Sequence, residues 1–155
     1  MTTTAEFSPD EWRTLQFAPF WIFSSLVGAY RDFDPAEFDV FSRSLDRAAG
    51  APGRLSREVV ASVQADLGWL RDQYECDSRT IAGGLCAVSD ALARVPIAEA
   101  QMFKEALVGV LGRTIATARG PFGQVATVEC LQMLRMDFEL LSEMPAPLSA
   151  HPGAA

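Results

Sequence analysis

Apolar residues recur at spacings of three and four along most of the chain, and this periodicity constrains the fold more than any other feature of the sequence. Such spacing places apolar side chains on one face of an α-helix. The pattern is clearest after Ser56, in the stripe formed by Val60, Val63, Leu67, Leu70 and Tyr74. The strict alternation of apolar and polar residues that is typical of half-buried strands is hard to find. The sequence therefore predicts an all-α protein.

Capping residues and prolines mark where the first helices begin and end. Ser8-Pro9-Asp10-Glu11 and Asp34-Pro35-Ala36-Glu37 each combine a capping residue, a proline in the first turn and a glutamate three residues after the cap. The first of these helices meets Pro19, which lacks an amide hydrogen and clashes with the preceding turn. We therefore expect a break or kink at Pro19, followed by a second helical piece that reaches about Val27.

Apolar spacing and turn residues also mark the remaining helices, which gives a predicted bundle of six or seven helices. The helix after Asp34 is expected to end near Gly50, before a turn at residues 51–53. Further helices are predicted from about Ser56 to Tyr74, from after Asp77-Ser78 to about Val95, after Pro96, and at 127–141 beyond a loop at 119–123. We expect residues 1–144 to form one compact helical domain and residues 145–155, rich in Pro, Ala and Gly, to form a disordered tail.

Glycines inside two of the predicted helices indicate close contacts between helices. Gly83-Gly84 interrupt one apolar helix, and Gly109 and Gly112 lie three residues apart on another. Because glycine has no side chain, we expect a neighbouring helix to approach closely at these positions.

Charge and hydropathy exclude two classes of partner. The net charge is −7, and the 13 basic residues are spread along the sequence. Nucleic acids and anionic membrane surfaces both require clustered Lys and Arg, so neither is expected as a partner. The longest uncharged apolar stretch, Phe17–Tyr30, has 14 residues. Because a helix needs about 20 residues to span a bilayer, no membrane insertion is expected.

Cysteine usage indicates a reducing compartment. The three cysteines are Cys76, Cys86 and Cys130, and their odd number and irregular spacing argue against a disulfide framework. We expect each to be a small buried apolar residue. Met1–Phe7 has neither a basic start nor an apolar run, so no signal peptide is predicted. A cytoplasmic location follows.

The usual components of an enzyme active site are missing from the sequence, which favours a non-enzymatic protein. The single histidine, His151, falls in the predicted tail, where no rigid scaffold would hold its imidazole beside a nucleophile. Neither common glycine-rich phosphate-binding motif occurs. An enzyme that uses carboxylates alone stays open, since the 20 acidic residues do not single out a pair.

One acidic segment is a candidate metal site. Asp32, Asp34, Glu37 and Asp39 lie at a turn between two predicted helices, where carboxylates could bind a divalent cation such as Ca²⁺ or Mg²⁺. The alternative is structural, because Asp34 and Glu37 also match a helix-capping box. The positions of a calcium-binding EF-hand loop are not met, since Glu37 stands where that loop requires glycine.

A dense aromatic cluster near the N-terminus is a candidate partner-binding surface. Its members are Trp12, Phe17, Phe20, Trp21 and Phe23. Packing in the core is the first interpretation. A partly exposed patch formed by Trp12, Phe17, Phe20 and Trp21 would instead bind a protein partner.

The segment from Ala18-Pro19 to Leu45 resembles the TerB-like helical domains, named for tellurite-resistance proteins. Members typically have Ala-Pro before an apolar helix, then Ala-Asp-Gly-x-Ile-Asp, then a helix that begins x-x-Glu. Here Ala29–Glu37 shares the second Asp, the hydrophobic residue before it and the Glu, whereas Tyr30 and Arg31 replace the first Asp and the Gly. A related element, Phe103–Leu107 running into 116–123, has no acidic turn.

The resemblance implies an all-helical fold with pseudo-symmetric helical hairpins. In the family, acidic turns are associated with divalent metals and the domains with stress responses near membranes. Our leading hypothesis is a non-enzymatic interaction module that binds a protein partner or forms a homodimer. The alternatives are a domain that responds to a divalent metal through the Asp32–Asp34 turn and a helical protein that binds a small ligand.

Overall fold

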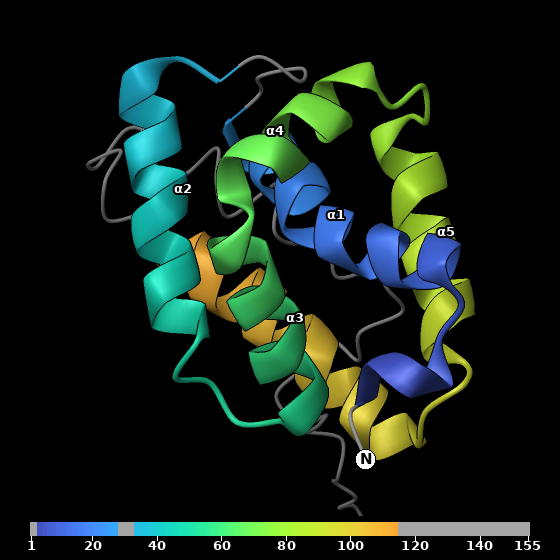
Figure 1. The fold of residues 1–155 in the computed structure, drawn as a ribbon. Helices are drawn as coiled ribbons and strands as arrows, with labels where there is room; N and C mark the ends of the chain where they lie inside the picture. Colours follow the sequence, from blue (N-terminus) through green and yellow to red (C-terminus); the bar gives the residue numbers. More distant parts are fainter. Residues whose placement is uncertain (1–2, 28–32, 115–155) are drawn as a thin grey trace, which may run out of the picture.

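The computed structural model describes residues 3–27 and 33–114, and this part of the chain contains six α-helices, a short 3₁₀-helix and no strand. The elements are η1 (Thr3–Glu6), α1 (Pro9–Val27), α2 (Pro35–Ala48), α3 (Arg54–Ala65), α4 (Leu67–Cys76), α5 (Ile81–Leu92) and a last helix through 97–114. α1 crosses the middle of the bundle between α2 and α5 and makes its most extensive contact with α5 (Figure 1). The all-α prediction is confirmed.

The two predicted helix starts are both present. At α1 the Glu11 amide donates to Ser8 Oγ at 3.2 Å, and the Ser8 amide donates to Glu11 Oε2 at 2.9 Å. At α2 the Glu37 amide donates to Asp34 Oδ1 at 2.7 Å, and the Asp34 amide donates to Glu37 Oε2 at 3.1 Å. Each pair satisfies two amides that the first helical turn leaves without partners.

Pro19 does not end the first helix, so the predicted break is wrong. α1 runs without interruption through Pro19. An interior proline costs about 3 kcal/mol through a lost hydrogen bond and a steric clash. Burial on both sides of it outweighs that cost, because α1 places eight apolar side chains in the core, namely Leu15, Phe17, Ala18, Phe20, Trp21, Ile22, Phe23 and Leu26.

The helix predicted from Ser56 to Tyr74 is two helices. The backbone leaves the helical region at Asp66, where φ is −125° and ψ is 34°, so α3 ends at Ala65 and α4 begins at Leu67. The junction residue is neither glycine nor proline, although Gly68 follows it in the first turn of α4. The apolar stripe continues across it, since Val63 and Leu70 are both fully buried.

Aromatic side chains from α1, α2 and α4 form the centre of the core. The Phe20 ring centroid lies 4.8 Å from that of Phe41 and 5.0 Å from that of Tyr74. The buried Tyr74 hydroxyl forms a 2.7 Å hydrogen bond with Ser24 Oγ. Core packing is therefore the role of most of the N-terminal aromatic cluster.

The predicted close approach of a neighbouring helix is wrong at Gly83 and Gly109, where a Cβ atom would meet only Thr80 and Arg113, respectively, which belong to the same helix or its cap. Gly84 confirms the prediction. A Cβ atom at this position of α5 would lie 2.2 Å from Cε2 of Trp21, so the indole occupies the space that a side chain would need. The expectation for cysteines was wrong at two positions, because Cys76 and Cys86 are exposed free thiols. Cys130, the helix at 127–141, the loop at 119–123 and the tail at 145–155 lie outside the described residues.

Candidate functional site

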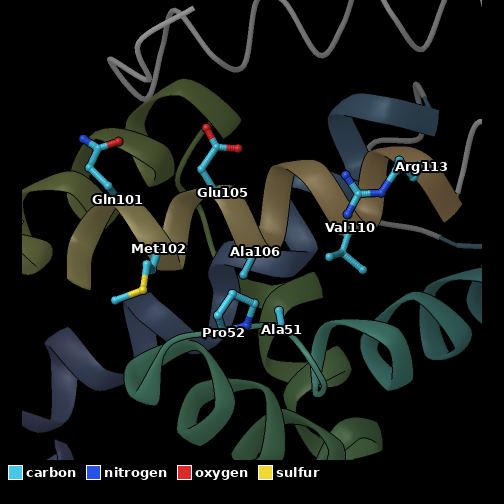
Figure 2. A pocket seen from close by; sticks show the side chains of 8 residues that line it. All are labelled: Ala51, Pro52, Gln101, Met102, Glu105, Ala106, Val110 and Arg113. Carbon is cyan, nitrogen blue, oxygen red and sulfur yellow. The ribbon is translucent and has the colours of Figure 1, made fainter. Parts of the chain in front are cut away.

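A hollow with a volume of about 350 Å³ lies between the α2–α3 connection and the helix at 97–114. Its lining residues are Ala51, Pro52, Gln101, Met102, Glu105, Ala106, Val110 and Arg113 (Figure 2). We call this feature the hollow. It is larger than a second surface cavity between α1 and α5, and its volume falls within the range of small-molecule sites.

The α2–α3 connection passes close to the last helix because of Gly53. This residue has φ of 110°, a left-handed conformation that side chains rarely adopt. A Cβ atom at Gly53 would also lie 3.0 Å from Ser56 Oγ and 3.3 Å from Met102 Cβ. Only glycine can adopt this positive φ and also leave room for Ser56 and Met102 without strain. The tight turn holds Ala51 and Pro52 opposite Met102 and thereby forms one wall of the hollow.

The opposite wall is an apolar stripe on the helix at 97–114. Met102, Ala106 and Val110, each four residues apart, point toward the loop, and the small Ala106 leaves the space between its neighbours empty (Figure 2). The Met102 side chain is 40% exposed. This helix buries Phe103, Leu107 and Leu111 in the core. Ala106 is also buried and Val110 packs against the core, so the stripe is the edge of the core-facing side of the helix, with Met102 as its exposed end.

Polar groups lie at the margin of the hollow. Gln101 and Glu105 extend from the other side of the helix, away from the apolar wall (Figure 2). The Arg113 side chain runs along its own helix toward Gly109, because one of its guanidinium nitrogens would be 3.4 Å from a Cβ atom at Gly109. The apolar wall and its charged margin suit an apolar group of a ligand or partner that is surrounded by polar atoms.

The predicted metal-binding residues have structural roles where the structure describes them. Asp34 and Glu37 form the capping box of α2, and Asp39 Oδ2 pairs with Arg43 at 3.2 Å on the exposed face of that helix. Asp32 lies outside the described residues. Within residues 3–27 and 33–114, no group of three His, Cys, Asp or Glu residues could hold a metal ion.

The Asp34 carboxylate provides a direct test of capping against metal binding. We expect Asp34→Ala to lower the free energy of unfolding by about 1 kcal/mol, because the Glu37 amide loses its acceptor. Asp39→Ala, which removes only an exposed ion pair, should change it by less than about 0.5 kcal/mol. Urea denaturation should give the same values in EDTA and in millimolar Ca²⁺ or Mg²⁺. A cation-dependent stabilisation that Asp34→Ala abolishes would instead indicate a metal site.

The predicted partner-binding aromatics are mostly inaccessible. Phe17, Phe20 and Trp21 are buried, and Trp12 is half-buried against the core beside Phe7. None of them lines the hollow. The sequence does contain a signal for the hollow, namely the spacing of four between Met102, Ala106 and Val110, which runs beside the stronger core stripe.

A smaller cavity of about 220 Å³ lies between α1 and α5 and is bordered by three carboxylates, those of Asp10, Glu11 and Asp90. Glu11 Oε1 accepts a 2.8 Å bond from Arg94 Nε, which ties the start of α1 to the residues after α5. The hydrogen bond from the Ser8 amide lowers the pKa of the Glu11 carboxyl, and Arg94 lowers it further. These contacts stabilise the helix start.

Comparison with protein-family models, curated proteins and solved structures gave no significant match to this chain. None of the helices in the described ranges combines the length and the apolar character needed to cross a bilayer.

Proposed function

We propose that this chain is a non-enzymatic helical binding module, and that the hollow receives an apolar side chain of a protein partner or of a second copy of the chain. The observation that carries the proposal is the pairing of a concave apolar surface with an exposed methionine at its edge. Methionine is flexible and polarisable, so it adapts to different apolar groups and is common on binding surfaces. Binding energy at protein interfaces is concentrated in such small pockets.

The proposed setting is the cytoplasm, as the cysteine pattern suggests. The TerB-like resemblance of residues 18–45 supports a role in a stress response. In this proposal, Asp34 and Glu37 of the acidic turn cap helix α2.

A small apolar ligand is the second candidate occupant, because about 350 Å³ lies toward the lower end of the range for small-molecule sites. Measurement of molar mass separates the two candidates. A protein partner or a second copy raises the mass of the particle well above 16.8 kDa, whereas a small ligand leaves it nearly unchanged.

Charge placed inside the hollow should disrupt association. In Met102→Glu, a carboxylate would have to be buried against Ala106 and Val110, so we expect association to weaken at least about tenfold. Light scattering after size-exclusion chromatography, over a range of protein concentrations, measures this effect for a homodimer. The same column run with a captured partner measures it for a hetero-complex.

Ile97→Glu is the matched control. Ile97 lies on the same helix, is 81% exposed and does not line the hollow, so this variant adds the same charge elsewhere. It should associate like the unmodified chain. Equal weakening by both variants would indicate a general charge effect and would contradict a specific role for the hollow.

A further inference from the structure

Trp69 is an exposed aromatic side chain on α4 that does not line the hollow. It is 51% exposed, and it is the one aromatic among the large apolar residues exposed in the described part of the chain. One face of its indole is covered by Arg13, whose guanidinium carbon lies 4.3 Å from the ring centroid. An exposed Trp on a helix is a typical anchor of a protein interface.

The covering arginine is itself held in place by a chain of hydrogen bonds. Arg13 Nε donates to Gln16 Oε1 at 3.2 Å, and Gln16 Nε2 donates to Ser62 Oγ at 3.2 Å. These contacts connect α1, α3 and α4 behind the indole. Because the ring is supported before anything binds, little side-chain entropy is lost when a partner packs on it.

Two carboxylates lie three residues before and three residues after Trp69 in the sequence, one at the junction before α4 and one within α4. Asp66 and Asp72 are exposed, and neither has an ion-pair partner among the described residues. Asp66 is the N-cap residue of α4, yet its side chain forms no capping bond. Next to the indole, a Cβ atom at Gly68 would meet nothing within 4 Å, so the surface is open to an approaching chain.

We propose that the Trp69 face, defined as Asp66, Trp69 and Asp72, binds a basic segment of a partner protein. An arginine or lysine side chain would pack on the accessible part of the indole while its charge is balanced by a carboxylate. Arg13 offsets one of the two carboxylates, which leaves the face with a net negative charge. A second copy of this chain carries a net charge of −7, and its 13 basic residues are spread along the sequence, so charge complementarity favours a different partner with a basic segment.

A synthetic eight-residue peptide of alternating Arg and Gly is a suitable probe, with Gln in place of Arg as its control. Titration into the full chain should shift the indole N–H resonance of Trp69, and the shift should disappear at high salt. The Gln peptide should give no shift. We expect Asp66→Asn combined with Asp72→Asn to weaken binding about tenfold or more in this titration. Trp69→Ala removes the reporting indole, so its binding is measured by isothermal titration calorimetry beside the unmodified chain, and it should weaken by a similar factor.

The matched control combines Glu6→Gln with Asp90→Asn, which changes the net charge equally and leaves the Trp69 face intact. Both residues are exposed and neither forms a salt bridge within the described ranges. Asn is a good N-cap residue, so Asp66→Asn should preserve the fold. Absence of peptide binding, or equal weakening by both double variants, would overturn the proposal. Met102→Glu should leave the titration unchanged, which separates this surface from the hollow.

Discussion

Gly84→Ala is expected to lower the free energy of unfolding by about 2 kcal/mol or more, although alanine is the better helix former. The new Cβ would lie 2.2 Å from Cε2 of Trp21 and within 2.5 Å of two further indole atoms. Trp21 has no room to retreat, because Phe17 packs against one side of it and the Arg79 guanidinium lies 4.9 Å from its ring. α1 and α5 must therefore separate along their extensive contact.

Gly68→Ala is the matched control for Gly84→Ala. It makes the same chemical change on α4, where the added atom would meet nothing within 4 Å. The gain in helix propensity should then make it neutral or stabilising by up to about 1 kcal/mol. Thermal unfolding should place the midpoint of Gly84→Ala roughly 5 °C or more below that of Gly68→Ala. Equal midpoints would contradict the close contact of α1 with α5 at Gly84 and Trp21.

Phe20→Ala should have the largest effect of these substitutions and should lower the free energy of unfolding by about 3–5 kcal/mol. Phe20 is fully buried, and its ring packs against Phe17, Phe41 and Tyr74, which come from α1, α2 and α4. Removing it leaves a cavity at the point where three helices meet. In a domain of this size the unfolding midpoint should fall by roughly 10 °C.

Trp69→Ala provides the comparison for Phe20→Ala, because it removes a larger aromatic ring from an exposed position. Trp69→Ala should lower the free energy of unfolding by no more than about 1 kcal/mol, mainly because the contact with Arg13 is lost. Circular dichroism in a urea titration measures both variants. Similar losses at the two positions would contradict the distinction between a buried aromatic core and an exposed aromatic on α4.

Local signals predicted the helix starts well, and tertiary packing explains where they failed. Ser8 and Asp34 could be identified because a capping box is made within four residues. Pro19 could not be judged in the same way, since the burial that overrides its cost comes from distant parts of the chain. The junction at Asp66 was missed because its apolar stripe continues unbroken from α3 into α4.

The candidate site was harder to predict than the fold. The sequence drew attention to Asp34 and Glu37, which are conspicuous because they are charged, and both serve as caps in the structure. The hollow is built from small and apolar residues such as Ala51 and Ala106, which look like ordinary core positions. Its shape depends on the left-handed turn at Gly53, which brings together residues about 50 positions apart. The spacing of Met102, Ala106 and Val110 marks one wall of the hollow in the sequence, but the contact between the two walls leaves no local pattern.

Site-specific photo-crosslinking from the hollow tests the central claim most directly. A benzoylphenylalanine is placed at position 102 in the full chain, and at position 97 in a parallel protein. After irradiation in source-cell lysate and in the concentrated purified chain, we predict a discrete adduct from position 102 that Val110→Glu suppresses and that position 97 does not form. Absence of an adduct from position 102 in both samples, or the same adducts from both positions, would contradict the claim that the hollow is the binding site.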